Sequence, residues 1–334
     1  MEKVKQIVSD IKRGNILPVY FLMGEESYYI DKIAEYIEKN ILSEEERGFN
    51  QMVLYGRDVT IDDIISNAKR YPMMAEKQVV IVKEAQNLSR TIENLEAYTL
   101  NPQPTTVLVI CYKYKTIDKR KKLYKALNKT GLVFESKKLY DNQVPDWIRR
   151  VLSGKNYTIS PKASQMLVEF LGTDLNKINN ELEKLQLILP AGSEITPSLI
   201  EENIGISKDY NNFELKKAIG ERNVLKATRI INYFAQNPKE NPLVVTVSLL
   251  FNFFSQLLHY HGLSDHSKSN VASTLKINPF FVSEYQIAAR NFPMKKVSQI
   301  VSSLRDIDTK SKGVGVTNLS HNDLLKELLT KILA

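Results

Sequence analysis

The chain has 334 residues, a net charge of +8 and a hydrophobic fraction of 43%, which together fit a globular protein of two or three domains. Its single cysteine, Cys111, excludes an internal disulfide framework and fits a reducing cytosol. The excess of basic residues favours an acidic partner such as nucleic acid. These residues are spread along the chain, however, so charge alone does not define a DNA-binding protein.

The first 140 residues alternate between strand and helix patterns. Each predicted strand is a short apolar run, and each predicted helix repeats apolar residues at helical spacing. The predicted strands are residues 17–24, 49–56, 78–82, 105–112 and 132–137, and the helices between them are 27–42, 60–70, 89–100 and 118–129. This alternation predicts an α/β domain with a parallel sheet covered by helices on both faces.

After about residue 140 the strand pattern disappears and the chain becomes helical. The apolar run at 242–262 is interrupted by polar residues, so it predicts a buried bundle helix rather than a membrane span, which needs about 18 apolar residues. We therefore expect an α/β domain over 1–140, a small helical domain over 141–210 and a helical bundle over 211–334. The predicted helices are 157–172, 173–189, 196–205, 212–220, 223–236, 242–262, 269–275, 280–291, 293–306 and 321–333.

An α/β domain followed by helices suggests a nucleotide-binding ATPase, but the phosphate-binding chemistry is missing. The first strand-to-helix turn, MGEESYYID at residues 23–31, has one glycine, no Gly-Lys-Ser/Thr and two acids, Glu25 and Glu26, that would repel phosphate. Where a metal-binding aspartate should follow the strand QVVIV, the chain has Lys83 and then Glu84. Both losses argue against ATP hydrolysis by this chain.

No other catalytic or metal-binding pattern is present in the sequence. His259, His261 and His266 are close in sequence, but residues at i and i+2 of a helix point apart, and no carboxylate or cysteine completes a ligand set. The paired acids Asp62-Asp63 and Glu201-Glu202 are typical of a helix first turn, where the dipole favours them. We therefore expect no catalytic residues, no metal and no cofactor.

The densest positive patch lies in KYKTIDKRKKLYKALNK, residues 113–129. Its lysines and arginine are either the solvated face of a helix or a surface that meets DNA phosphates or a partner subunit. The candidate contact residues are Lys119, Arg120, Lys121 and Lys122.

A pair of methionines, Met73 and Met74, lies in YPMMAEKQVVIV between a predicted helix and a predicted strand. A segment that enters a strand is usually exposed to water, so two long apolar side chains there need an explanation. They are either tucked inward as core or held outward for a partner, and the sequence alone leaves both open.

Several segments in order resemble the delta subunit of the bacterial DNA polymerase III clamp loader. The resemblance is specific from about residue 17 to residue 220 and looser through DIDTKSKG to the C-terminus. It is carried by VYFLMGEESYYIDK, YPMMAEKQVVIVKEAQNL, NPQPTTVLVI with DKRKKLYKAL, Trp147, LGTDLNKINNELEKL and SKDYNNFELKKAI.

This resemblance implies a non-catalytic subunit with an AAA+-type module that lacks a working P-loop, a helical lid and an all-α collar. The collar would join other clamp-loader subunits in a hetero-pentamer that acts on primed DNA in the cytoplasm, with no membrane. The subunit would bind the sliding clamp, the beta subunit, through an apolar pair at the position of Met73 and Met74, with Pro72 shaping the segment. The family often carries an aromatic residue in this pair; this chain has methionine, which keeps volume and flexibility but loses the ring.

The leading hypothesis is thus a subunit of the replication machinery that binds and opens the sliding clamp without hydrolysing ATP. The alternative is an active AAA+ ATPase with a degenerate phosphate loop. A third class, a sequence-specific DNA-binding protein, lacks support, because no helix clusters the Arg, Asn and Gln side chains that read base edges.

Overall fold

The computed structural model describes residues 2–207, 209–315 and 319–334. The chain divides into two compact units, residues 1–139 and 140–334, and each is described by itself. The predicted further division at residue 210 stays a prediction. Within the segment SKDY, Lys208 lies outside the described residues.

Unit 1, residues 1–139, contains a five-stranded parallel sheet in the order β2-β3-β4-β1-β5. Its central strands are continuous apolar runs that are buried on both faces, as expected for a sheet between two helical layers. The strands are β1 (Val19–Gly24), β2 (Gln51–Tyr55), β3 (Gln78–Lys83), β4 (Thr106–Lys113) and β5 (Leu132–Ser136). The predicted fold class of this domain is confirmed.

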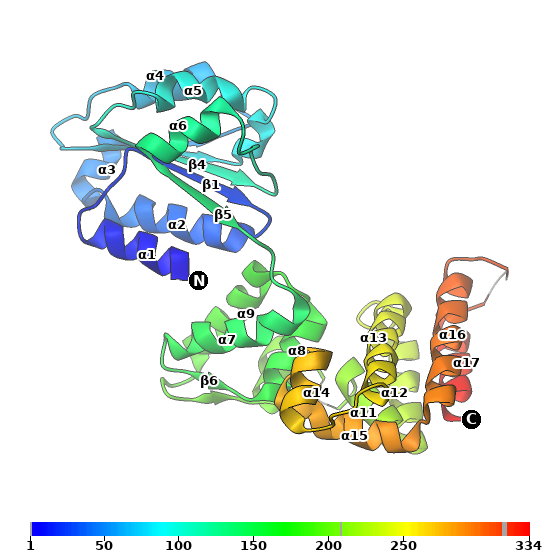
Figure 1. The fold of residues 1–334 in the computed structure, drawn as a ribbon. Helices are drawn as coiled ribbons and strands as arrows, with labels where there is room; N and C mark the ends of the chain where they lie inside the picture. Colours follow the sequence, from blue (N-terminus) through cyan, green and yellow to red (C-terminus); the bar gives the residue numbers. More distant parts are fainter. Residues whose placement is uncertain (1, 208, 316–318) are drawn as a thin grey trace. The chain divides into compact units, whose positions relative to one another are not determined.

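Helices cover both faces of this sheet (Figure 1). On one face Ile30, Ile33 and Ile37 of α2 are fully buried. On the other face, side chains from α4 and α6 form one apolar core with alternate strand residues such as Phe21 and Val80. The helices of unit 1 are α1 (Glu2–Lys12), α2 (Ser27–Asn40), α3 (Glu44–Asn50), α4 (Ile61–Ala68), α5 (Glu96–Thr99) and α6 (Lys122–Thr130).

Three predictions for unit 1 were wrong in detail. The predicted strand at 49–56 begins only at Gln51, because α3 extends to Asn50. The predicted helix at 89–100 is a 3-10 turn, η2 (Ile92–Leu95), followed by the short α5; another 3-10 turn, η1 (Ala85–Leu88), precedes it. The predicted helix at 118–129 begins at Lys122, since Lys119, Arg120 and Lys121 belong to the preceding loop.

Unit 2 is mostly helical, as predicted, with one small exception. Two short strands, β6 (Thr158–Ile159) and β7 (Glu194–Ile195), pair in parallel, so the strand pattern does not vanish completely after residue 140. The helices of unit 2 are α7 (Val144–Ser153), α8 (Pro161–Leu171), α9 (Leu175–Ile188), α10 (Pro197–Ile204), α11 (Asn212–Gly220), α12 (Val224–Gln236), α13 (Leu243–His261), α14 (Lys268–Leu275), α15 (Val282–Asn291), α16 (Met294–Ser311) and α17 (His321–Leu333).

Helices α11 to α17 share one apolar core. Among the described residues, α13 is the one helix whose length and composition would allow it to cross a membrane. Leu250, Phe254 and Leu257 of α13 are buried in this core. The prediction that residues 242–262 form a bundle helix is therefore confirmed.

Candidate functional site

Met73 and Met74 lie in the loop that joins α4 to β3, and both side chains face solvent. Met73 is 63% exposed, and Met74 is as exposed as a residue in an extended chain, at 105%. Neither belongs to the apolar core of unit 1. The structure therefore decides between the two interpretations of the sequence: the methionines are presented outward.

The same loop holds Tyr71, Pro72 and Ala75. Tyr71 is 77% exposed, whereas Pro72 and Ala75 are partly buried. The helix predicted at 60–70 ends slightly earlier, since α4 ends at Ala68 and the loop begins at Lys69. The pair is thus presented by a loop rather than by a helix end.

Buried polar side chains fix the start of this loop. The Gln78 side-chain amide donates to the Arg70 carbonyl at 2.6 Å and to Thr106 Oγ1 at 2.7 Å. Thr106 Oγ1 in turn donates to the Ala68 carbonyl at 2.8 Å. These bonds satisfy carbonyls that the end of α4 leaves without a helical partner, so the helix end and the first strand residue hold each other in place.

Asn50 fixes the middle of the loop. Its Nδ2 donates to the Met73 carbonyl at 2.9 Å, and its Oδ1 accepts from the Met73 N–H at 2.6 Å. Asn50 is only 5% exposed, so its side-chain amide is shielded from water, and both bonds are partly buried. Sequence reasoning missed this residue, because the two partners are 23 positions apart and no local pattern connects them.

The backbone at Met74 is in the left-handed region, with φ of 53°. A residue other than Gly, Asn or Asp adopts this region at an energetic cost, and such positions cluster at functional sites. Here the strained conformation follows directly after the residue that Asn50 holds. The loop therefore has a defined shape, and the two methionine side chains project from a fixed backbone.

In a related fold, a nucleotide would bind at the opposite edge of the sheet, which is formed by the carboxyl ends of the parallel strands. The turn after β1 leads into α2, whose N-terminal amides would face a phosphate. Glu26 occupies this position instead: it is 6% exposed and its Oε1 accepts from the Tyr28 N–H at 3.1 Å. A carboxylate of the chain itself therefore caps the helix end that an ATPase leaves open.

A second ionic group closes the same edge. Lys113, at the end of β4, lies 2.8 Å from Asp31 of α2 and 2.9 Å from Glu84, which follows β3. Burial acts to lower the pKa of Lys113, but the hydrogen bonds to Asp31 and Glu84 outweigh it and raise that pKa. A bound metal–phosphate group would need free carboxylates at this position. Here the carboxylates of Asp31 and Glu84 are already paired with Lys113.

Lys83, predicted in place of a metal-binding aspartate, pairs with Glu38 of α2 at 3.2 Å. Among the described residues, no group of three or more His, Cys, Asp and Glu side chains is arranged to hold a metal ion. Burial raises the pKa of the Cys111 thiol to about 12, so this cysteine stays protonated in the core.

The basic segment before α6 is exposed but partly neutralised. Lys119 pairs with Glu135 at 3.1 Å, and Arg120 pairs with Asp118 at 2.7 Å. Lys121 and Lys122 are also exposed at the N-terminus of α6, where cations gain nothing from the helix dipole. This placement keeps the four side chains accessible to a partner.

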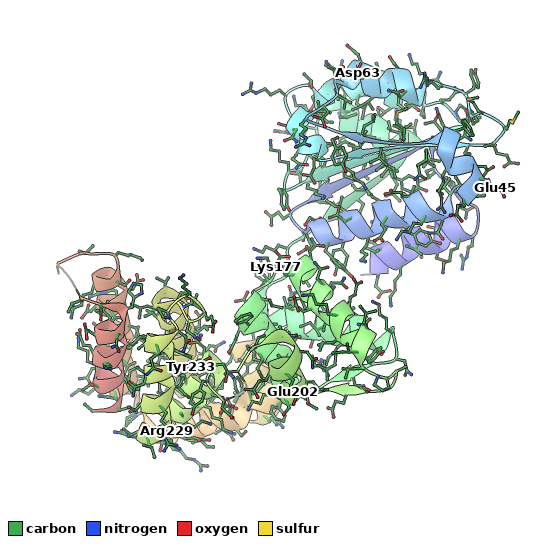
Figure 2. All side chains as sticks on the ribbon, turned by 180° about the vertical axis from the view of Figure 1, so that it is seen from behind. Glu45, Asp63, Lys177, Glu202, Arg229 and Tyr233 are labelled. Atoms are coloured by element: carbon green, nitrogen blue, oxygen red, sulfur yellow. The ribbon has the colours of Figure 1, made fainter. Side chains whose placement is uncertain are left out.

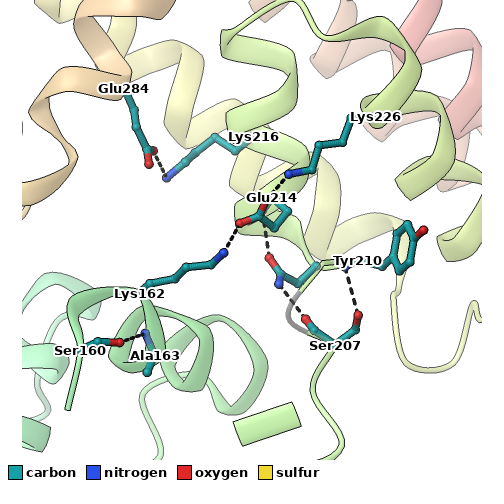
Figure 3. Close-up of polar contacts among 10 residues, drawn as sticks. Ser160, Lys162, Ala163, Ser207, Tyr210, Glu214, Lys216, Lys226 and Glu284 are labelled. Atoms are coloured by element: carbon teal, nitrogen blue, oxygen red, sulfur yellow. Dashed lines mark hydrogen bonds and ion pairs between the residues drawn. The ribbon is translucent and has the colours of Figure 1, made fainter. Parts of the chain in front are cut away.

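Unit 2 contains a polar cluster around Glu214 of α11 (Figure 3). The Glu214 carboxylate is 3% exposed and pairs with Lys162 of α8 and with Lys226 of α12. Nearby, Lys216 Nζ lies 4.7 Å from the centre of the Phe213 ring and 3.9 Å from Glu284. Burial of this kind is tolerated because each charge has partners, and the cluster ties four helices together, α8, α11, α12 and α15.

Comparisons with known proteins add the family. Residues 20–137 match the family described as DNA polymerase III, delta subunit, and residues 209–328 match DNA polymerase III delta subunit, C-terminal domain. Together the two matches span well over half of the chain. The chain belongs to the delta subunit family of DNA polymerase III. It is a clamp-loader subunit of bacterial DNA replication and therefore one component of a larger complex.

Relatives from one organism agree with this assignment. The chain is 28% identical to DNA polymerase III subunit delta of Bacillus subtilis (strain 168), over 97% of this chain and 95% of that protein. Its fold is similar to the solved structure of the Bacillus subtilis DNA clamp loader delta protein. That match has a TM-score of 0.54 and 26% identity and covers 99% of both chains.

Proposed function

We propose that this clamp-loader subunit binds the sliding clamp through Met73 and Met74, with Pro72 shaping the loop, and opens the clamp ring without hydrolysing ATP. The observation that carries the proposal is the exposure of two adjacent methionines on a loop whose backbone is held by hydrogen bonds from buried side chains. Exposed apolar side chains on a well-fixed segment are typical of a docking site rather than of a surface loop.

Two methionines suit such a site. Full burial of one large apolar side chain contributes about 1.5–3 kcal/mol, so the pair would supply a few kcal/mol on docking. The cost of ordering the loop would be small, since Asn50 and Gln78 already hold it in the free chain. The flexible thioether side chains would then adapt to an apolar recess on the clamp.

Docking opens a ring only if the open ring is bound more tightly than the closed one. A ligand shifts a conformational equilibrium by its differential affinity for the two states, about 1.4 kcal/mol for each tenfold change. We infer that the fixed loop fits a clamp surface whose shape belongs to the open ring. In this view the energy for opening comes from binding, and this chain needs no nucleotide of its own.

The charged side chains at the carboxyl ends of the strands support the lack of ATP hydrolysis. Glu26 caps the helix that would hold phosphate, and Lys113 occupies the space between Asp31 and Glu84. Each group has the same sign of charge as the ligand that would bind there: an anion where phosphate would lie and a cation where a metal ion would lie. ATP use by the loader would then belong to neighbouring subunits.

The remaining expectations concern other partners. We propose that residues 211–334 form a collar that joins the other subunits of a hetero-pentamer and that residues 141–210 form the lid. The exposed Lys119, Arg120, Lys121 and Lys122 would contact primed DNA or a neighbouring subunit. Contacts to phosphate of this kind weaken steeply with added salt.

The test is a titration of the purified chain against the sliding clamp of the same organism, without nucleotide. The Met73→Asp, Met74→Asp double variant should bind at least about 30-fold more weakly, because hot-spot losses of about 2 kcal/mol or more are expected when buried apolar anchors become charged. Met294→Asp is the matched control, since Met294 is also exposed, at 53%, but lies on α16 of unit 2. Equal binding by a folded double variant would contradict the site.

The ATPase alternative is tested separately with a fluorescent ATP analogue. We expect no saturable binding of the analogue by the isolated chain. Saturable binding at micromolar concentrations would favour the alternative.

A further inference from the structure

One large aromatic side chain beside the methionine loop has no role so far. Phe49, the penultimate residue of α3, is 78% exposed. It directly precedes Asn50, whose side chain bonds to both polar atoms of the Met73 backbone. Phe49 and the methionine loop are therefore connected through one residue.

The sheet topology brings the two segments to the same edge. Strands β2 and β3 are parallel neighbours, and Gln51 at the start of β2 pairs with Val79 at the start of β3. The residues that precede each strand consequently emerge side by side: α3 ends just before β2, and the methionine loop ends just before β3. We call Phe49, Tyr71, Met73 and Met74 together the docking surface.

Phe49 is held on a fixed element although α3 is short. The helix begins with a capping box in which Ser43 and Glu46 bond to each other's backbone N–H. Arg47 Nη2 donates to the Lys39 carbonyl at 2.5 Å, which ties α3 to the end of α2. Glu45 of the same helix projects from the surface (Figure 2). A fully capped helix that leaves a phenylalanine in water presents that ring at little further ordering cost.

Interface size argues that the partner covers more than the two methionines. A stable protein–protein interface buries about 800 Å² on each partner, far more than two side chains provide. The clamp must therefore also cover residues next to the loop, and aromatic residues and methionine are enriched in such interfaces. Phe49 directly precedes Asn50, the residue that bonds to the loop, and it is an exposed aromatic residue.

We infer that Phe49 is a third anchor of the docking surface and inserts into the same apolar region of the sliding clamp as Met73 and Met74. This inference rests on the proposed function. It assigns a role to a helix that precedes β2 and lies outside the methionine loop. Asn50 is the positioning residue, because it holds the methionine loop in a fixed place relative to the helix that carries Phe49.

The test combines a contact readout with an affinity readout on the full chain. Phe49 is replaced by benzoylphenylalanine, the clamp is added without nucleotide, and the mixture is irradiated; the same replacement at Tyr55, which is 44% exposed at the opposite end of β2, is the control. In parallel, Phe49→Asp, Phe49→Leu and Tyr55→Asp are titrated against the clamp, with the thermal melting of each variant measured.

We expect a clamp adduct from position 49 and none from position 55. Phe49→Asp should bind at least about tenfold more weakly at unchanged melting temperature, Phe49→Leu should stay within about threefold of the wild type, and Tyr55→Asp should bind normally.

Failure of this inference is distinct from failure of the proposed function. If the wild type binds and the methionine variant does not, while position 49 gives no adduct and Phe49→Asp binds normally, only the role of Phe49 is wrong. If the wild-type chain does not bind the clamp at all, the proposed function and this inference are both overturned. Weakened binding by Phe49→Asp with normal binding by the methionine variant would move the site to α3 and overturn the shared surface.

Discussion

The two edges of the sheet in unit 1 use their polar side chains in different ways. At the edge where β1, β3 and β4 end, charged residues turn inward on one another: Glu26 caps α2, and Lys113 joins Asp31 to Glu84. At the edge where β2 and β3 begin, buried amides hold the backbone while apolar side chains point outward.

The difference shows how one α/β scaffold can lose one site and present another. Polar groups that satisfy each other leave nothing for a ligand, so the first edge is closed. At the second edge the polar groups bond to the loop backbone, so the apolar side chains of the loop stay available to a partner and this edge is open. Asn50 and Gln78 provide hydrogen bonds to the loop backbone, and the methionine side chains remain exposed.

The largest expected effect on stability comes from the closed edge. Lys113→Met removes the cation and leaves Asp31 and Glu84 close together without their partner. Both acids are partly exposed, so we expect the free energy of unfolding to fall by about 1–3 kcal/mol rather than by the larger amount typical of a fully buried pair. Urea denaturation measures this loss. Clamp affinity should stay within about twofold, and a proportional loss of affinity would show that the two edges are not independent.

The pH dependence of that loss has a defined window. Burial acts to raise the pKa of Glu84, but its bonds to Lys113 and Gln86 lower it below the ordinary 4.5, whereas the pKa of Lys113 is raised above 10.5. A lowered carboxyl pKa stabilises the fold above pH 4.5, and a raised lysine pKa stabilises it below pH 10.5. The difference between wild type and Lys113→Met should thus be constant from pH 5 to 10 and shrink in acid. A difference that grows below pH 4.5 would contradict the assignment.

The Asn50→Ala variant tests whether the open edge depends on the bonds from Asn50 to the methionine loop. Without the amide, the Met73 N–H and carbonyl lose their buried partners, so amide hydrogen exchange over residues 70–77 should accelerate and clamp affinity should fall by about 5–20-fold. Asn50→Asp keeps the acceptor for the Met73 N–H but loses the donor, so it should bind with intermediate affinity. Unchanged exchange in Asn50→Ala would mean that the loop keeps its shape without this residue.

The smallest effect is expected from Glu26→Ala. Loss of a helix cap typically costs about 1 kcal/mol, and melting of the variant measures it. The uncapped α2 should still bind no ATP analogue, because the turn has no phosphate-binding lysine. Micromolar analogue binding by this variant would show that the edge is a blocked nucleotide site rather than a lost one.

The sequence predicted most of unit 1 because its central strands are apolar runs and its longer helices repeat apolar residues at helical spacing. Helix α4 also begins with a local signal, in which Thr60 is the N-cap and Asp63 completes a capping box. The pattern failed where elements are short or depend on distant partners. Helix α3 is polar and brief, and the segment around Ile92 is a 3-10 turn rather than a regular helix.

The candidate site was predicted only in part. The segment with Met73 and Met74 was found from its position before a strand, but periodicity could not tell whether the pair faces the core or the solvent. That depends on Asn50, which has no sequence signal because its partner lies 23 positions away. The same applies to Lys113: a lysine at a strand end indicates nothing until Asp31 and Glu84 are seen beside it.

The most direct test of the account is hydrogen exchange of the chain with and without the sliding clamp, in the absence of nucleotide, because one experiment reports on both edges. We predict slower exchange over residues 48–50 and 71–75 on clamp binding, with unchanged exchange over residues 25–31 and 83–86. Protection of the second pair of segments, or of neither pair in a complex that has formed, would contradict it.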